Sequence, residues 1–239
     1  MTAGTTSGPR AAGRAEGLLL VDKPAGVTSH DMILAARRAY GERSIGHLGT
    51  LDPFATGLLV ILIGRATRLS TFIDTEPKVY DATIRFGTET DTDDTTGVVT
   101  RSAPLPDARS VRDAVLDLTG ELMQVPPAYS AKSSGGTRAY DAARQGAPLE
   151  LPPAHVRVYG WTIQEQREDS LRAIITCGGG TYIRALARDL GRATGSAAHL
   201  ASLRRTRCGP FDVADAASLE DLRNSPPPLR ALTVVTGNA

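Results

Sequence analysis

Hydrophobic residues along this chain form two kinds of pattern that predict strands. Residues 58–63 are an unbroken apolar run, which is typical of a strand covered on both faces. Residues 78–86 alternate instead, so the apolar set shares one face: Tyr80, Ala82, Ile84 and Phe86. By the same two patterns, further strands are expected near Val98 and at residues 17–21, 156–166, 171–177 and 199–213.

Two segments have the spacing of amphipathic helices. In residues 27–41, Thr28 can cap the start and Gly41 can end the helix. The face of this helix predicted to be buried holds Met32, Ile33, Ala36 and Tyr40. Residues 181–195 combine an apolar face with arginines at four-residue steps: Arg184, Arg188 and Arg192. Shorter helices are expected at residues 65–73, 110–120 and 218–222.

Strands and helices are therefore interspersed, and several neighbouring strands have the spacing of hairpins. This arrangement predicts an α/β (α+β) fold with a mixed, largely antiparallel sheet flanked by helices and loops. A length of 239 residues with 41% hydrophobic content is sufficient for a substantial core. Residues 1–16 have no apolar segment of a secretory signal and are predicted to be a disordered leader.

Charge and cysteine content restrict the function only slightly. No apolar run approaches the roughly 20 residues of a membrane helix. Cys177 and Cys208 do not suggest a disulfide framework or a metal site, which favours the cytoplasm. The net charge of +1 neither supports nor excludes nucleic acid, because binding depends on local clusters of positive charge.

Three segments have both a ligand-binding and a structural interpretation. Residues 91–97, DTDDTTG, resemble a calcium loop, but Gly97 falls one place late and Ser102 replaces the expected Glu, so a turn is favoured. The glycines of residues 177–180 could bind an anion through backbone N–H groups, or simply separate a strand from a helix. The basic cluster at 203–207, together with the arginines of 181–195, is either a solvated face or a phosphate-binding surface.

The segment GHLGTLDPFATG, residues 46–57, contains a single charged residue in a loop rich in glycine. Asp52 could cap a turn, since Asp-Pro favours turns. It could also be a functional carboxylate, which would need a cation to hold it ionised and aimed. From the residues alone, Tyr80 suits a core tyrosine with a bonded hydroxyl and His47 suits a structural histidine.

Seven motifs in the same order resemble those of one family, the TruB-type tRNA pseudouridine synthases. The resemblance extends from about Gly17 to Leu222. The motifs are GLLLVDKPAGVTSHD, GHLGTLDPFATGLL, KVYDATIRFGTETDTDDTTG, QVPPAYSA, RAYDAARQG, CGGGTYIRALARDLG and AHLASLRRTRCGPF. The resemblance implies the pseudouridine synthase fold, with uridine 55 in the T loop of elongator tRNAs as the substrate and with no cofactor or metal.

The resemblance also assigns roles to individual residues. It implies that Asp52 is the catalytic aspartate, that Arg184 pairs with it, and that Tyr80 stacks on the uracil and takes the C5 proton. The substrate-binding set that it implies is His47, which would help displace the base, with Tyr182, Leu203, Lys23 and Lys132. Many members carry the last lysine one place later, where this chain has Ser133.

The same resemblance predicts the domain organisation. Residues 17–223 would be the catalytic domain, with residues 124–146 as a loop that closes over RNA. Residues 224–239 would be a linker and tail, and the usual C-terminal RNA-binding domain would be missing, whether by nature or by truncation. We therefore expect weaker tRNA binding than in longer relatives, with the chemistry on the T arm intact.

The expected partner is tRNA through its T arm, with no membrane, no obligate protein partner and a monomeric state. Two alternatives come from other classes. One is a non-catalytic tRNA-binding or RNA-folding module on the same scaffold. The other is a hydrolase that cleaves the base from ribose, although the sequence has no second carboxylate motif to activate water.

Overall fold

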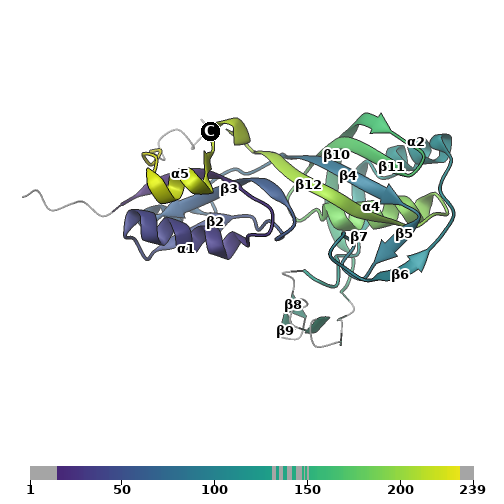
Figure 1. The fold of residues 1–239 in the computed structure, drawn as a ribbon, viewed down its shortest axis with the longest axis horizontal. Coiled ribbons are helices and arrows are strands. Elements are labelled where there is room, and N and C mark those ends of the chain that lie inside the picture. The colour runs from purple at the N-terminus through teal and green to yellow at the C-terminus, as the bar shows by residue number, and fades with distance from the viewer. Residues whose placement is uncertain are drawn as a thin grey trace, which may run out of the picture.

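The computed structural model describes residues 15–130, 133–134, 137–138, 142–143, 147, 149 and 151–231. Within this part of the chain, one large sheet extends through the molecule in the order β14-β1-β3-β12-β4-β11-β10-β7 (Figure 1). Its strands are β1 (Gly17–Lys23), β3 (Thr56–Ile63), β4 (Lys78–Phe86), β7 (Gly120–Gln124), β10 (Ala154–Gln166), β11 (Ser170–Cys177), β12 (Ala198–Cys208) and β14 (Ala217–Ser218). β2 (Ile45–Leu48) pairs with β3, and β13 (Phe211–Asp212) pairs with β12.

Most neighbouring strands in this sheet are antiparallel. The exceptions are β14 beside β1 and β12 beside β3, which are parallel pairs. Two small antiparallel pairs lie outside the large sheet, β5 (Thr88–Thr90) with β6 (Val99–Ser102) and β8 (Ser133–Ser134) with β9 (Thr137–Arg138). The predicted mixed, largely antiparallel sheet is thus confirmed.

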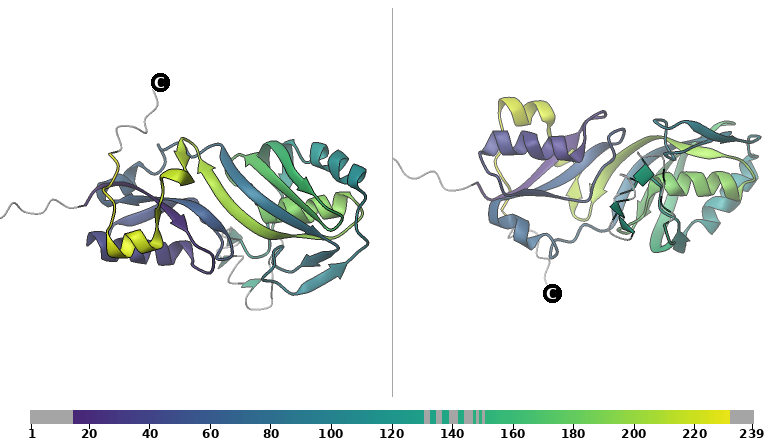
Figure 2. Two further views of the ribbon diagram at one scale, coloured as in Figure 1. Left: turned by 45° about the horizontal axis from the view of Figure 1, so that its top comes forward. Right: turned by 90° about the horizontal axis from the view of Figure 1, so that it is seen from below.

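Helices cover the two ends of the sheet separately. α1 (Ser29–Tyr40) and α5 (Leu219–Asn224) lie against the end that contains β1, β2 and β3, whereas α2 (Ala108–Asp117) and α4 (Ile183–Ala193) cover the other end (Figures 1 and 2). Two short 3-10 helices, η1 (Gly64–Leu69) and η2 (Val213–Asp215), connect elements. No helix in the described part of the chain is long and apolar enough to cross a membrane.

The start and end of α1 agree with the sequence. Thr28 and Asp31 form a capping box, and Gly41 closes the helix with a positive φ of 63°. Three residues of the expected buried face are buried, while Tyr40 is only half-buried because its hydroxyl reaches out to donate to the Pro227 carbonyl at 2.6 Å.

Other boundaries differ from the prediction. α2 begins at Ala108 because Asp107 caps it, and it ends at Asp117, before Gly120 starts β7. The strand expected near Val98 begins at Val99. The predicted helix at residues 65–73 is a 3-10 helix that ends at Leu69.

The core forms on both faces of β3, as its unbroken apolar run predicts. Leu58, Val60 and Leu62 join one apolar cluster, with Cys208 and Phe211. The alternate residues of the strand face a second cluster beneath α1: Leu59, Ile61 and Ile63. A third, larger cluster fills the space between α4, α2 and the apolar face of β4.

β12 joins the two ends of the molecule because it lies between β3 and β4 (Figure 2). The contact between β3 and β12 depends on Gly57, which has a φ of 102°. A Cβ at this position would lie 2.2 Å from the backbone oxygen of Arg205, so only glycine allows the two strands to pair here. The two ends of the sheet therefore meet in a tightly packed joint.

Candidate active site

Asp52 lies in the loop between β2 and β3, and this loop is fastened to the start of α1. The hydroxyl of Ser29 accepts a hydrogen bond from the Leu51 N–H at 2.9 Å and donates to the Leu51 carbonyl at 3.0 Å. On the other side of Asp52, the Pro53 carbonyl accepts from the Gly26 N–H at 2.8 Å. The backbone around the carboxylate is thus held on both sides.

Lys23 supports the same loop from below. Its ammonium donates to the carbonyls of Pro24 at 3.0 Å, Val27 at 2.7 Å and Pro53 at 3.4 Å. The side chain has no exposed surface, and burial lowers its pKa to about 8, although Asp52 nearby acts in the opposite direction. The substrate contact expected of Lys23 does not fit this position, and we interpret the residue as a support for the loop.

Arg184, at the start of α4, holds the carboxylate of Asp52 with two parallel hydrogen bonds. Its Nε donates to Oδ2 at 2.9 Å and its Nη2 to Oδ1 at 3.1 Å. The guanidinium is itself fixed, because Nη1 donates to the Thr92 carbonyl and Nη2 to the Tyr129 carbonyl, each at 2.8 Å. Arg184 is 5% exposed and Asp52 is 34% exposed, so the carboxylate faces an opening while its partner is buried.

A cavity of about 250 Å³ opens beside this ion pair. It brings together five of the residues that the sequence singled out: Asp52, Tyr80, Tyr182, Arg184 and Leu203. These residues come from the β2–β3 loop, β4, α4 with the residue before it, and β12, so the sheet and one helix end form its walls. Aromatic and aliphatic side chains in its walls are combined with a few charged and polar groups, a composition typical of small-ligand sites.

Tyr80 is both a core residue and a wall of this cavity. It is 7% exposed, and its strand pairs with β11 at Ile175 and with β12 at Arg205. Burial raises the pKa of its hydroxyl to about 12, against an opposing effect of Arg205, so the phenol is protonated at neutral pH. The two interpretations of Tyr80 from the sequence are therefore compatible.

Of the other two predicted substrate contacts, only His47 belongs to the described part of the chain. His47, on β2, does not line this cavity, and its Nδ1 is buried without a hydrogen-bond partner among the described residues. Burial lowers the pKa of His47, with Arg205 and His30 adding to the effect, which favours the neutral ring. Lys132 lies outside the described residues.

Sequence reasoning did not assign Gln124, Lys78 or Arg205 to this site, and it considered Arg205 only as part of the basic cluster at 203–207. The side chain of Gln124 is 3% exposed and makes two hydrogen bonds to the backbone of Tyr182. It accepts from the Tyr182 N–H at 2.9 Å and donates to the Tyr182 carbonyl at 3.2 Å. Lys78 and Arg205 line the cavity directly. Strand alternation was a usable signal for the last of these, because Arg205 lies two residues after Leu203 on the same strand.

The arginines do not form the open phosphate-binding surface that one interpretation proposed. Arg188 donates to Asp93 at 2.9 Å and Arg192 to Glu89 at 2.8 Å. Arg204 pairs with Asp22 at 2.6 Å. Because carboxylates neutralise these arginines, their charge stabilises the fold around the site.

The other two ligand-binding interpretations are also replaced by internal contacts. The Gly179 N–H does bind an anion, but it is the protein's own Glu76 carboxylate, at 2.7 Å. In the loop of residues 91–97, Asp94 Oδ1 accepts from the hydroxyls of Thr92 and Thr96, which makes a turn. Among the described residues, no group of acidic, histidine or cysteine side chains could hold a metal ion.

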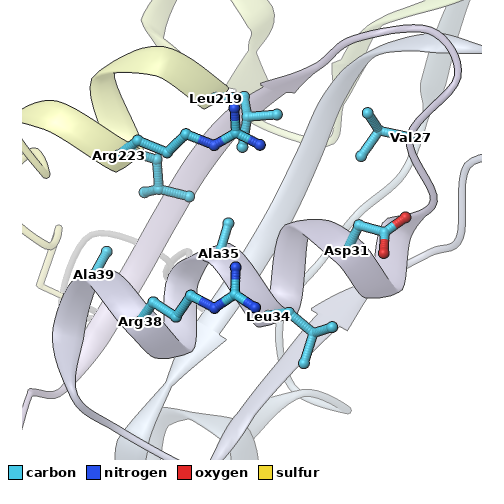
Figure 3. Close-up of a pocket in the computed structure, with 9 residues that line it drawn as sticks. Val27, Asp31, Leu34, Ala35, Arg38, Ala39, Leu219 and Arg223 are labelled. Carbon is cyan, nitrogen blue, oxygen red and sulfur yellow. The ribbon is translucent and has the colours of Figure 1, made fainter.

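A second, larger cavity lies apart from Asp52, between α1 and α5. It has a volume of about 470 Å³, and Figure 3 shows Arg38 and Arg223 on the two helices that form its sides. Leu34, Leu219 and Leu222 contribute apolar surface to it. None of the site residues predicted from the sequence lines this cavity, so the chemistry is assigned to the smaller one.

Two family models match consecutive parts of the chain. Residues 37–183 match the family model described as TruB family pseudouridylate synthase (N terminal domain), and residues 184–226 match that of the tRNA pseudouridylate synthase B C-terminal domain. Together with the fold and the site, these matches define a pseudouridylate synthase. The boundary between the two family models falls between Ile183 and Arg184, within the stretch predicted as one catalytic domain.

Individual relatives are similar over most of the chain. The tRNA pseudouridine synthase B of Corynebacterium efficiens is 46% identical over 215 residues, which cover 87% of this chain and 72% of that protein. The protein of the same name from Thermobifida fusca is 47% identical over 218 residues, which cover 87% and 74%. The chain therefore belongs to the TruB family of pseudouridylate synthases.

Two solved structures share the fold. An H/ACA RNP bound to a substrate RNA containing 2'-deoxyuridine includes a chain with 25% identity and a TM-score of 0.64. A chain of a Cbf5-Nop10-Gar1 complex has 27% identity and a TM-score of 0.67. Each match covers 87% of this chain but only about half of the solved chain, 52% and 54% respectively.

Proposed function

We propose that this chain is a tRNA pseudouridine synthase that converts uridine 55 of the T loop into pseudouridine. The observation that carries the proposal is the bidentate pair of Asp52 and Arg184 in a cavity that Tyr80, Tyr182 and Leu203 also line. The family, the relatives named tRNA pseudouridine synthase B and the size of the cavity support the same substrate class. The position within tRNA rests on the family resemblance.

The reaction is an isomerisation, so no atom is gained or lost overall. The bond between N1 of uracil and C1′ of ribose breaks and leaves its electron pair on N1. The uracil turns, C5 forms a new bond to C1′, and the proton on C5 leaves while N1 gains one. A carboxylate beside C1′ can stabilise the positive charge on the sugar, form a covalent intermediate with it, or take a proton from C2′.

Each of these roles requires Asp52 to be ionised and correctly aimed. Arg184 places its positive charge against the carboxylate, and two charge-assisted hydrogen bonds hold the carboxylate in one orientation. Two further hydrogen bonds, to backbone carbonyls, fix the guanidinium itself. The exposed fraction of Asp52, 34%, leaves an oxygen accessible to a ribose placed over the opening. The arrangement thus serves to aim a single negative charge.

The walls of the cavity also have a role. Water in the site would hydrolyse the intermediate and release free uracil, so the site must exclude it. Tyr80 and Leu203, 7% and 8% exposed, provide apolar surface against which a base can pack. A phenol protonated at neutral pH, as in Tyr80, is suited to stacking on the base and to donating a hydrogen bond.

The substrate base must leave its stack in the RNA to reach this cavity, which costs a few kcal/mol. We propose that the T arm binds over the opening beside Asp52, and that the chain acts alone, as a monomer in the cytoplasm with its tRNA substrate. His47, on β2, does not line the cavity, so any help that it gives in displacing the base acts outside the cavity.

The substitution Asp52→Asn tests the proposal. It keeps the shape of the side chain but removes its charge, and we expect release of tritium from C5-labelled T-arm RNA to fall by at least about 1,000-fold. Asp113→Asn, on the exposed surface of α2, is the control and should leave the rate unchanged. Persistent tritium release in Asp52→Asn would contradict the assignment.

Analysis of the RNA product separates the alternative functions. A synthase yields the C-glycoside pseudouridine, whereas a hydrolase yields free uracil and an abasic ribose. A non-catalytic module yields neither and binds the T arm equally well with Asp52→Asn. Only the C-glycoside agrees with the proposal.

A further inference from the structure

Arg205 is the most deeply buried arginine of the site, and it links two of its walls. The side chain belongs to β12 and is 1% exposed. Its Nε donates to the Leu58 carbonyl at 2.8 Å, and its Nη2 donates to the Gly49 carbonyl at 3.0 Å. Gly49 begins the segment that leads to Asp52, so Arg205 holds this loop at Gly49 while Ser29 holds it at Leu51.

The same guanidinium interacts with Tyr80. The two residues are directly opposite each other in the register of β12 and β4, and both line the cavity. The positive charge of Arg205 and its hydrogen bonding both favour the ionised form of the phenol, which lowers the pKa of Tyr80 against the larger effect of burial. Arg205 therefore contacts the backbone before Asp52 and the side chain of the residue expected to stack on the base.

The charge of Arg205 is not neutralised by any carboxylate in the described part of the chain. Its hydrogen bonds there go to neutral groups, namely two backbone carbonyls and the phenol of Tyr80. Arg184, Arg188, Arg192 and Arg204, in contrast, each pair with an Asp or Glu. A buried cation without a counter-ion is costly, because its charge has lost the hydration that it has in water.

The geometry points to a use in the reaction. We propose that Arg205 is a positioning residue that fixes Tyr80 and the Gly49 carbonyl, and that its unpaired positive charge stabilises the uracil while the base carries the electron pair of the broken N1–C1′ bond. In this arrangement the cavity separates two charges. Asp52 faces the positive sugar, and Arg205 favours the negative base. The inference rests on the proposed function.

Three variants separate the charge from the packing. Arg205→Met removes both the charge and the hydrogen bonds, Arg205→Gln keeps a donor without charge, and Arg205→Lys keeps the charge. The matched control is Arg207→Met, because Arg207 lies on the same strand but is 55% exposed and pairs with Asp212 at 3.2 Å. Single-turnover tritium release from C5-labelled T-arm RNA gives the rate, and filter binding gives the Kd.

The rate should fall by about 100-fold in Arg205→Met and in Arg205→Gln, with the Kd changed by less than about threefold. The rate of Arg205→Lys should be at least about tenfold higher than that of Arg205→Met. Arg207→Met should behave as the wild type. Weaker RNA binding with an unchanged rate would overturn the proposal, and so would an Arg205→Lys variant as slow as Arg205→Met. Equal losses of rate in Arg205→Met and Arg207→Met would overturn it as well.

A substrate with a more stable leaving base provides a readout that a purely structural role would not change. Fluorine at C5 stabilises the uracil anion, so T-arm RNA with 5-fluorouridine depends less on an external positive charge. The rate at which this RNA is consumed is measured by nucleoside analysis. The factor by which Arg205→Gln slows the reaction should be at least about tenfold smaller for this RNA than for RNA with uridine. Equal losses on both RNAs would show that the charge does not act on the base.

The outcome remains informative if one variant folds poorly. Circular dichroism and thermal unfolding identify such a variant, and the comparison of two RNAs by one folded variant does not depend on its stability. A wild-type protein that makes no pseudouridine would refute the proposed function itself. Active wild type with an Arg205→Gln variant of full rate would refute only the inference about Arg205.

Discussion

Two basic residues lie beside the loop that carries Asp52, and they differ in the groups that accept their hydrogen bonds. Arg184 reaches the carboxylate directly, whereas Lys23 reaches only backbone carbonyls beneath the loop. The sequence suggested that Asp52 needs a cation, and the family resemblance named Arg184 as the residue that provides it. Neither could show that Lys23 is buried, because burial of a lysine depends on how the loop folds over it.

The pH dependence of stability should reveal the buried ammonium. Burial lowers the pKa of Lys23 to about 8 from its ordinary 10.5, so between these values the unfolded chain binds a proton that the folded chain has lost. The free energy of unfolding of the wild type, relative to Lys23→Met, should therefore rise by about 2 kcal/mol from pH 8 to pH 10.5. Denaturant titrations at several pH values measure it, and parallel curves for the two proteins would contradict it.

At the scale of elements, the sequence patterns predicted the buried faces of helices and strands better than they predicted the contacts between these elements. The apolar run of β3 and the alternation of β4 both predicted which faces are buried, and the structure confirms both. Gln124 gave no such signal, because its role depends on where β7 ends relative to the start of α4. The arginines of α4 were visible in the sequence, but Asp52 and Asp93, the partners of Arg184 and Arg188, lie in loops whose paths no local pattern fixes.

The clamp between β7 and α4 can be tested through Gln124. Its amide satisfies both backbone groups of Tyr182, so Gln124→Ala should lower the free energy of unfolding by about 1–2 kcal/mol and leave Tyr182 less well placed. Activity measured by tritium release should fall by about tenfold. Gln164→Ala, at an exposed position of β10, should change neither quantity, and equal effects of the two substitutions would show that the clamp is unimportant.

At the scale of the whole molecule, the site lies where the two ends of the sheet meet. β12 supplies Leu203 and Arg205 to the cavity and pairs with β3 on one side and with β4 on the other. Fold class was predictable from the order of elements and from the resemblance. The position of β12 in the centre of the sheet was not, because the strand pairs with partners more than a hundred residues away.

The joint between the two ends of the sheet should be intolerant of a side chain at Gly57. In Gly57→Ala, the methyl group would overlap the backbone of Arg205, and a φ of 102° is unfavourable for alanine. We expect the free energy of unfolding to fall by about 3 kcal/mol or more, with loss of activity. Gly160→Ala has free space around the added atom and is the control, and a Gly57→Ala protein as stable as Gly160→Ala would contradict the described joint.

The central place of β12 also has a consequence for biosynthesis. The sheet remains divided between β3 and β4 until this strand, which follows α4 in the chain, has left the ribosome. A nascent chain that already exposes Asp52 and Arg184 therefore still lacks the strand that joins their supports. Catalytic competence is expected to arise in one late step of translation, so that incomplete chains do not modify RNA.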